Sequence, residues 1–419
     1  MSTTAFPRRL QLFTLCDALL AESGEYASTA LAREALAGYQ TLDALGREQF
    51  FDTLAREYSP SPQAVGKTAA AFQADPSADN LARLQAAVES PRKELFRRLN
   101  MAADGTAALV EMRRELLKNL RAKPHWRVID DDLFYLLREW FNRGFLRLER
   151  IDWRTSAIVL EKLIQYEAVH AIQGWRDLRR RLEADRRCFA FFHPQLPDEP
   201  IIFIEVALTR SMSAHIQPLL DIGAPVNPGH CDCAMFYSIT NCQEGLRGIS
   251  FGNQLIKQVA EELKREFPHL RRFATLSPIP GFRRWLDQQR REKPKELAAL
   301  ARIDETDWHH GEVSDALQRT LLRLCAYYLV QAKQGQEPLD PVARFHLGNG
   351  AALERLNWLG DISESGMQRS AGLMVNYVYW LTEVERNHER YWREGAVAAS
   401  PQIDKMAREC LLADKGVAA

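Results

Sequence analysis

The sequence lacks any apolar run that approaches the roughly 20 residues needed to cross a bilayer. It also lacks an excess of charge of either sign, because 55 basic side chains balance 55 acidic ones. A chain with this balance has no global attraction to nucleic acid or to an acidic membrane surface. Residues 1–13 contain no signal-peptide apolar region, and residues 414–419 carry no targeting signal. We therefore expect a cytoplasmic protein with neither nucleic acid nor membrane as a partner.

Cysteine is scarce and irregularly spaced, with seven in 419 residues. An odd number without a regular spacing argues against a disulfide framework and favours a reducing compartment. The run HCDC at residues 230–233 resembles half of a metal site. No second CxxC or HxxxH motif accompanies it, and zinc normally needs a tetrahedral set of ligands. We expect this run to be a plain surface loop, and we expect no metal ion in the protein.

The chain is long enough for two domains, and its apolar pattern changes near residue 135. Before that point apolar side chains recur at helical spacing, first at Leu42, Leu45, Phe50, Leu54 and Tyr58. The same spacing continues at Leu81, Leu84, Val88, Leu95 and Leu99. Residues 1–135 therefore predict an all-helical domain for packing or oligomerisation.

Strand-like runs dominate the middle of the second part. Residues 188–193, 201–208, 233–239 and 272–276 predict strands, the first two joined by a turn at 194–200. Residues 252–267 predict an amphipathic helix, and helices return at 313–334. The class is therefore α+β, with residues 136–419 forming an α/β catalytic domain around a mixed sheet.

The segment FATLSPIPGF at residues 273–282 is the most informative one for function. A strand-like run delivers Ser277 to a bend that Pro278, Pro280 and Gly281 restrict. The hydroxyl of Ser277 therefore lies at a rigid strand end, a common place for reactive side chains. Taken alone, such a serine is usually a turn or cap residue.

A glycine-containing loop upstream opens the helix at 252–267. Unpaired N–H groups and the helix dipole make such a helix start a cradle for pyrophosphate. Neither GxGxxG nor the P-loop motif is present. The pattern resembles the pyrophosphate loop of GNAT acetyltransferases, with serine in place of the usual first glycine. An ordinary strand–helix turn remains the alternative. The loop consists of Arg247, Gly248, Ile249, Ser250, Phe251, Gly252 and Asn253.

Several longer segments together resemble the malonyl-CoA decarboxylase family over residues 135–385. They include WFNRGFL at 140–146, LSPIPGF at 276–282, HLGNGA at 346–351 and GLMVNY at 372–377. The resemblance implies a helical domain followed by a GNAT-like catalytic domain, and a homo-oligomer, with a tetramer suggested by the family. It implies that malonyl-CoA is converted to acetyl-CoA and carbon dioxide without a metal or organic cofactor.

The resemblance also assigns roles to three side chains. Ser277 and His346 occupy the serine and histidine of the family's motifs, and Tyr379 matches an active-site tyrosine. A glutamate that some relatives carry in the glycine loop is Ser250 here, so its role cannot be transferred. We expect His346 to be the acid that protonates the enolate, because imidazole titrates near neutral pH. Ser277 would either bind the malonyl carboxylate or hold the imidazole.

Other readings stay open at this point. A GNAT-type N-acyltransferase would use the same loop, and so would a non-catalytic acyl-CoA sensor. His170 is expected to be structural. The basic runs at 179–181, 186–187 and 283–284 are expected to be solvated faces, one of which could meet the 3′-phosphate of coenzyme A.

Overall fold

The computed structural model describes most of the chain, and its described part divides into two compact units. The described residues are 5–221, 223–249, 251, 255–305, 308–310, 313 and 315–412, and side chains 5–9 and 143 are excluded. The first unit comprises Met1–Leu146, His193–Glu199 and Gln243–Phe251. The second unit comprises Arg147–Phe192, Pro200–Cys242 and Gly252–Ala419. The predicted boundary at residue 135 stays a prediction.

The first unit is helical, as the apolar spacing predicts. Its helices are α1 (Ala5–Ala21), α2 (Glu25–Gln40), α3 (Ala44–Glu57), α4 (Pro62–Ala74), α5 (Ala78–Val88), α6 (Pro91–Leu99), α7 (Gly105–Asn119) and α8 (Arg127–Trp140). Short 3₁₀ turns also occur, namely η1 (Pro124–Trp126), η2 (Arg143–Phe145) and η4 (Glu244–Leu246). Ser61 and Ser90 cap the starts of α4 and α6, each followed by a proline at the first helical position.

Burial in this unit departs from the predicted pattern at Leu45 of α3, which is 60% exposed, and along α5. Phe50 and Leu54 are buried in the main helical core, as expected from α3. Leu81 and Val88 of α5 are 41% and 49% exposed, and neither α4 nor α5 has a buried residue. The helical period therefore identifies α5 correctly, but it does not reveal whether the apolar face has anything to pack against.

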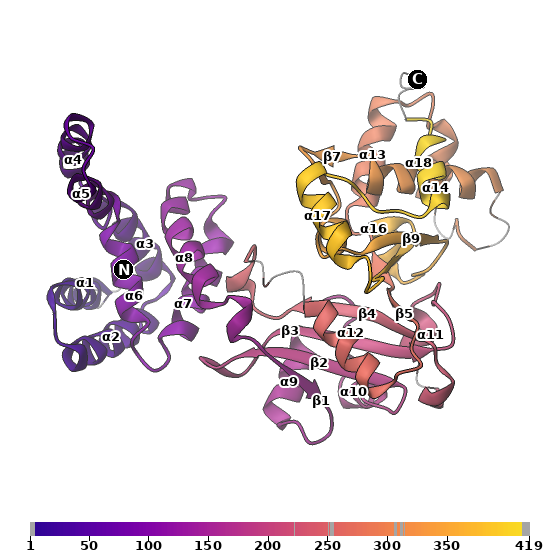
Figure 1. Cartoon of the computed structure of the whole chain (residues 1–419), viewed down its shortest axis with the longest axis horizontal. Helices are drawn as coiled ribbons and strands as arrows, with labels where there is room; N and C mark the ends of the chain where they lie inside the picture. The colour runs from indigo at the N-terminus through magenta and orange to yellow at the C-terminus, as the bar shows by residue number, and fades with distance from the viewer. Residues whose placement is uncertain are drawn as a thin grey trace. The chain divides into compact units, whose positions relative to one another are not determined.

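The second unit is built on a mixed sheet (Figure 1). Its strands follow the order β1–β2–β3–β4–β5–β10–β6, and β9 pairs with β10. β4 and β5 are parallel, whereas β10 is antiparallel to β5, β6 and β9. The strands are β1 (Arg147–Ile151), β2 (Arg186–His193), β3 (Leu196–Thr209), β4 (Cys233–Asn241), β5 (Arg272–Thr275), β6 (Ser277–Pro278), β9 (Ala352–Asn357) and β10 (Met374–Val378).

Helices accompany this mixed sheet, which confirms the predicted α+β class with a helical part followed by a sheet-containing domain. They are α9 (Ala157–Tyr166), α10 (Trp175–Arg181), α11 (Gln217–Leu220), α12 (Leu255–Glu266), α13 (Phe282–Glu292), α14 (Asp315–Val330), α15 (Pro341–Gly348), α16 (Glu364–Ser370), α17 (Val384–Glu394) and α18 (Pro401–Arg408). The remaining elements are η3 (Pro228–His230), η5 (Ala298–Asp304) and the ribbon of β7 (Lys333–Gln334) with β8 (Glu337–Pro338).

Two apolar clusters hold the sheet to its helices. One joins Leu160 and Leu163 of α9 to Ala190 of β2 and Phe203 of β3. The other joins Leu219 of α11 to side chains of β3, β4, β5 and β10, among them Met235 of β4. Together they fix the central strands from which the candidate site is built. None of the described helices combines the length and apolar character that a membrane span requires.

The predicted surface loop at 230–233 is wrong in part. Cys231 and Cys233 are both buried, and Cys233 is the first residue of β4. The cause is the parallel pairing of Cys233 with Arg272 of β5, which draws the end of the run into the sheet. All seven cysteines are buried.

Candidate active site

The site begins where the parallel pair β4 and β5 stops. The register pairs Phe236 with Thr275, and the N–H of Leu276 donates to the carbonyl of Phe236 at 2.9 Å. The next residue, Ser277, pairs instead with Val375 of β10. The chain thus changes neighbour within two residues, and β4 loses its partner on that side beyond Phe236.

A cavity of 230 Å³ lies between the separated strands. Most of its lining is apolar, which suits an acyl group and keeps bulk water from polar groups inside. The polar side chains in it belong to Ser238, Asn241, Ser277 and His346. Its other lining residues are Val169, Phe236, Tyr237, Ile239, Leu276, Pro278, Pro341, Val342 and Phe345.

Ser277, His346 and Tyr379, the three predicted catalytic residues, lie in contact. The Ser277 Oγ is 3.1 Å from the Nε2 of His346, and the Nδ1 of His346 is 2.8 Å from the Tyr379 hydroxyl oxygen. All three residues are buried. The structure therefore places hydroxyl, imidazole and phenol in one hydrogen-bonded row that opens on the cavity.

His346 is positioned by α15, a short helix with a capped N-terminus. Asp340 caps α15 and accepts from the N–H groups of Val342 and Ala343, both at 2.9 Å. His346 lies in the last turn of that helix, and its ring stacks on Tyr377 at 4.6 Å between centroids, with 26° between the planes. Both ring nitrogens and one ring face are therefore occupied, which leaves the imidazole little freedom to rotate.

Thr275 is a member of this row that the sequence analysis missed. Its Oγ1 is 2.8 Å from the Ser277 Oγ and accepts from the N–H of Tyr377 at 3.1 Å. The side-chain amide of Asn376 donates to the carbonyl of Thr275 at 2.7 Å. Residues two apart on an extended chain point to the same side, so Thr275 could have been found from Ser277 by that period alone.

Burial makes the imidazole neutral in the free protein. Desolvation lowers the pKa of His346 to about 3, although a helix C-terminus by itself favours the protonated form. Desolvation likewise raises the pKa of Tyr379 well above its usual range. The expectation that His346 titrates near neutral pH is therefore wrong for the unliganded state. Its predicted role as the acid needs a further source of proton affinity.

The glycine loop lies partly outside the described residues. Ser250, Gly252 and Asn253 are among the residues left out, so their predicted role stays a prediction. In the first unit the preceding turn is held by Arg113, which donates to the carbonyls of Gly245 and Arg247 at 2.7 and 3.1 Å.

Gly248 has φ +85°, a conformation that favours glycine, while Ile249 and Phe251 are buried. The backbone at Arg247 and Gly248 therefore has a defined turn. Whether its N–H groups bind pyrophosphate stays a prediction.

Most of the basic runs are not solvated faces, which corrects that expectation. Arg180 and Arg181 are buried and form ion pairs with Asp185 and Glu205, both at 2.7 Å. Arg186 and Arg187 are also buried and ion-paired. Glu205 and Glu266 lie far along the chain from the arginines they pair with, and Asp185, although close in sequence, gave no sign that it is buried with Arg180 and Arg186.

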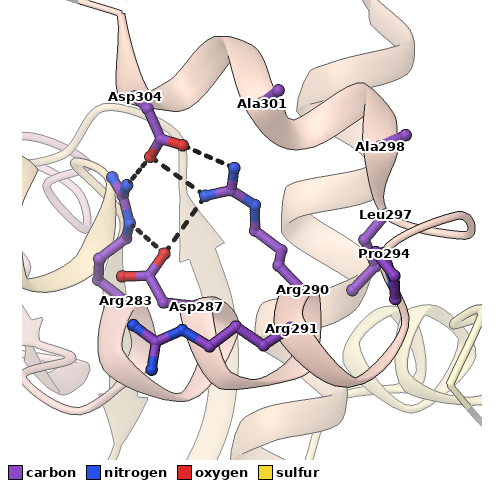
Figure 2. A pocket seen from close by; sticks show the side chains of 9 residues that line it. All are labelled: Arg283, Asp287, Arg290, Arg291, Pro294, Leu297, Ala298, Ala301 and Asp304. Atoms are coloured by element: carbon purple, nitrogen blue, oxygen red, sulfur yellow. Dashed lines mark hydrogen bonds and ion pairs between the residues drawn. The ribbon is translucent and has the colours of Figure 1, made fainter.

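Arg283 belongs to a second, more open cavity of 560 Å³ (Figure 2). Its guanidinium pairs with Asp287 at 3.1 Å and also with Asp304, while Arg290 reaches Asp304 at 2.6 Å. These carboxylates largely neutralise the arginines, which weakens the case for a phosphate site there. Among the described residues, no group of three or more His, Cys, Asp or Glu side chains is arranged to hold a metal ion.

Comparison with known proteins covers nearly the whole chain. The family described as "Malonyl-CoA decarboxylase C-terminal domain" matches residues 144–415, and "Malonyl-CoA decarboxylase N-terminal domain" matches residues 58–141. The mitochondrial malonyl-CoA decarboxylase of Rattus norvegicus is 38% identical over 353 residues, which is 77% of this chain and 72% of that protein. The enzyme of Anser anser anser is 38% identical over 347 residues, 75% of this chain and 69% of that protein.

Two solved structures are similar over almost their full length. The malonyl-CoA decarboxylase of Rhodopseudomonas palustris is 49% identical with a TM-score of 0.91, covering 95% of this chain and 99% of that one. The one from Agrobacterium vitis is 46% identical with a TM-score of 0.89, covering 94% and 99%. With both domain families matched in order, this chain belongs to the malonyl-CoA decarboxylase family.

Proposed function

We propose that this protein converts malonyl-CoA to acetyl-CoA and carbon dioxide at the cavity between β4 and β5. Family membership supports the reaction and its substrate. The observation that carries the assignment of the site is the 3.1 Å contact between Ser277 and His346 inside a mostly apolar cavity. We further propose that the reaction uses no metal and no organic cofactor.

The chemistry makes two demands on the cavity. When the bond between the α-carbon and the carboxylate breaks, its electron pair delocalises onto the thioester oxygen as an enolate. Hydrogen-bond donors aimed at a developing oxyanion are worth about 2.7–4 kcal/mol each in comparable sites. A proton must then reach the α-carbon, and a positioned acid typically contributes about 10²–10⁴-fold to the rate. The reaction as a whole consumes one proton.

We infer that the substrate itself brings the proton affinity that the free imidazole lacks. Burial holds His346 neutral, with its pKa lowered to about 3. A malonyl carboxylate in the same cavity adds a negative charge near the ring, and a nearby opposite charge favours the protonated form. Binding would then draw one proton onto His346. That proton would pass to the α-carbon after carbon dioxide leaves.

Ser277 and Tyr379 support this role from either side of the ring. Each contacts a different ring nitrogen, so together they fix its plane. This geometry favours the second predicted role of Ser277, holding the imidazole. Decarboxylation needs no acyl transfer, so no acyl-serine is expected.

The coenzyme A moiety would be bound by backbone N–H groups of the glycine loop, from Arg247 to Asn253. The turn at Gly248, with its positive φ, supports a loop whose backbone can approach phosphate closely. We also propose a homo-oligomer, a tetramer by the family resemblance, and a cytoplasmic location. The odd number and irregular spacing of the seven cysteines suit a reducing compartment.

A single assay tests the reaction. Purified protein is incubated with malonyl-CoA while acetyl-CoA and carbon dioxide are measured, and equal amounts of both are expected. Release of free CoA only after an amine is added would replace this function with N-acyltransfer. Binding of malonyl-CoA without turnover would replace it with a sensor role.

A further inference from the structure

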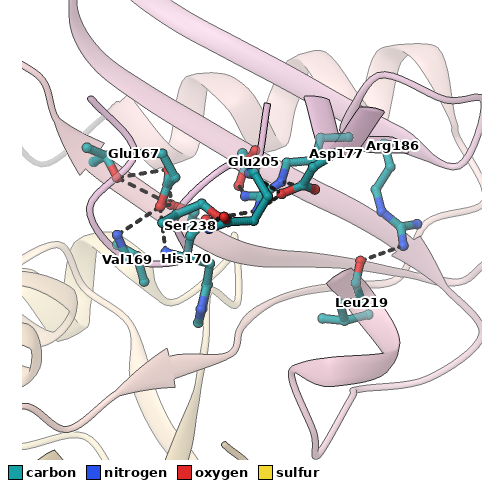
Figure 3. A network of polar contacts seen from close by, with 12 residues as sticks. Glu167, Val169, His170, Asp177, Arg186, Glu205, Leu219 and Ser238 are labelled. Atoms are coloured by element: carbon teal, nitrogen blue, oxygen red, sulfur yellow. Dashed lines mark hydrogen bonds and ion pairs between the residues drawn. The ribbon is translucent and has the colours of Figure 1, made fainter. Parts of the chain in front are cut away.

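One short segment contributes Val169 to the lining of the catalytic cavity, and buried polar side chains hold its backbone. Residues 168–170, here named the wall segment, follow α9 directly. Glu167, only 5% exposed, precedes them. Its Oε1 accepts from the N–H groups of Val169 and His170, both at 2.8 Å (Figure 3). The backbone of the wall segment is therefore fastened to a carboxylate.

The same carboxylate fastens the segment to the sheet. The hydroxyl of Ser238 donates to both Glu167 oxygens at 2.8 Å, and the hydroxyl of Thr240 donates to Oε2 at 3.1 Å. Ser238 lies on the part of β4 that lines the catalytic cavity. Glu167 thus ties two sides of the cavity together. Charged acceptors form stronger hydrogen bonds than neutral ones, so this tie is a firm one.

Arg181 completes the attachment from the other side. Its Nη2 donates to the carbonyl of His170 at 2.8 Å, while its Nη1 pairs with Glu205 at 2.7 Å. Arg181 and Glu205 are both buried, and Asp177 provides a second carboxylate at 3.1 Å. The N–H of His170 is therefore held by Glu167, and its C=O is held by Arg181. We name these two side chains together the charged clamp.

The wall segment separates two cavities. Val169 lines the catalytic cavity and also a neighbouring cavity of 390 Å³, and Pro278 is the other residue common to both linings. Val169 faces the same space as Ser277 and His346, which is where the acyl group must lie in the proposed reaction. If the segment moved toward the neighbouring cavity, the acyl space would widen. The clamp prevents this movement.

We propose that the wall segment limits the size of acyl group that the catalytic cavity accepts. Val169 is its specificity-determining side chain, and the two residues of the charged clamp position it. The inference rests on the proposed decarboxylation for where the acyl group lies. Its selectivity follows from packing, because an apolar pocket typically discriminates against one extra methylene by about 10–200-fold.

The test compares malonyl-CoA with methylmalonyl-CoA, which carries one more methyl on the reacting carbon. In Val169→Ala we expect the ratio of kcat/KM for methylmalonyl-CoA over malonyl-CoA to rise about tenfold, the low end of that range. Val159→Ala is the matched control, since Val159 is a buried valine of α9 that lines neither cavity. It makes the same truncation and should leave the ratio unchanged.

Two clamp variants separate positioning from a general loss of structure. Glu167→Gln keeps an oxygen that accepts from the Val169 and His170 N–H groups, so its ratio should match the wild type. Glu167→Ala removes every one of these bonds, so its ratio should rise as in Val169→Ala. If Glu167→Ala does not fold, Ser238→Ala, which removes one tie to the sheet, should raise the ratio by a smaller factor. A merely structural residue would lower both turnover rates together.

A binding measurement keeps the inference testable if the wild type does not decarboxylate malonyl-CoA. Dissociation constants of acetyl-CoA and propionyl-CoA, measured by calorimetry, should favour propionyl-CoA more in Val169→Ala than in the wild type. If decarboxylation fails but this shift in binding is present, the proposed function is overturned, and the proposal that the wall segment limits acyl size is kept. If the ratios of both turnover and binding are unchanged while the clamp variants are folded, the proposal that the wall segment limits acyl size is overturned.

Discussion

Two buried polar networks border the cavity between β4 and β5, and they differ in charge. The row Thr275–Ser277–His346–Tyr379 consists of neutral groups, and burial lowers the pKa of His346 and raises that of Tyr379. The charged clamp consists of ionised groups whose hydrogen bonds end on backbone and on fixed partners. Both are buried, so exposure does not distinguish them.

The difference shows how one cavity separates chemistry from support. A neutral imidazole beside an open cavity can still gain a proton when a negatively charged substrate arrives, so its protonation state is free to change. Glu167 already accepts several hydrogen bonds, and Arg181 already faces carboxylates of opposite charge. Leaving either side chain unpaired would cost folding free energy. The neutral row therefore suits proton transfer, whereas the clamp suits holding a backbone in place.

The largest expected effect is on the neutral row. His346→Asn keeps a polar side chain of similar reach but cannot carry a proton to carbon. We expect kcat for malonyl-CoA to fall about 10²–10⁴-fold, the usual contribution of a positioned acid. The dissociation constant for acetyl-CoA, measured by calorimetry, should change far less. Near-normal turnover in this variant would remove His346 from the role of acid.

The second prediction concerns stability against pH. The pKa of His346 is lowered from 6.5 to about 3 by burial, so the unfolded chain binds more protons between these values. This contribution to stability is complete above about pH 6.5 and is lost as the pH falls toward 3. Between pH 8 and pH 5 the wild type should lose about 2 kcal/mol more than His346→Asn, since each pKa unit corresponds to about 1.4 kcal/mol.

Urea unfolding of the two proteins at both pH values measures this difference. His170, whose pKa burial lowers to about 4, is present in both proteins and cancels in the comparison. Parallel losses of stability in the two proteins would mean that the imidazole of His346 is not desolvated as the structure indicates.

A smaller effect is expected one step further along the row. Thr275→Val is close in shape but removes the hydroxyl that bridges Ser277 and the N–H of Tyr377. A neutral hydrogen bond contributes about 1 kcal/mol, so kcat should fall about fivefold to tenfold with KM little changed. Thr275→Ser restores the hydroxyl and should recover most of the rate. If Thr275→Ser were as slow as Thr275→Val, restoring the hydroxyl would not restore the rate, and the hydrogen bond alone would not explain the effect.

The smallest effect is expected where charges are exposed. Asp304→Ala removes the partner shared by Arg283 and Arg290, but the Asp304 side chain is 49% exposed. Exposed ion pairs contribute less than about 1 kcal/mol and are screened by salt. Thermal unfolding should therefore shift only slightly, and malonyl-CoA turnover should stay at the wild-type rate. A large loss of turnover would show that this arginine cavity takes part in substrate binding.

Helix α12 shows what the local pattern can predict. Leu255, Ile256, Val259 and Leu263 repeat at helical spacing, and the structure buries all four. Strands β4 and β5 were equally predictable from the sequence, because alternation and apolar content are properties of residues that are neighbours in the chain. The same reasoning identified α5 but placed Leu81 and Val88 inside, since spacing along a helix carries no information about what lies opposite.

The candidate site was predictable only in part, and by different means. The pairing of Ser277 with His346, 69 positions apart, followed from family motifs and not from any spacing. Thr275 was within reach of a two-residue period, yet its partner Tyr377 lies on another strand. Glu167 and Arg181 carried no signal, because their importance depends on which carbonyls and N–H groups the fold brings to them.

By itself, the sequence determined the order of helices and strands, the serine at a strand end and the family to which the chain belongs. These features depend on short-range periodicity and on motifs whose residues are close together in the chain. The tertiary structure alone decided that His346 is neutral, that four arginines of the basic runs are buried and that Val169 lines the cavity beside Ser277. Desolvation and charge pairing are sums over neighbours in space, and most of those neighbours are distant in the chain.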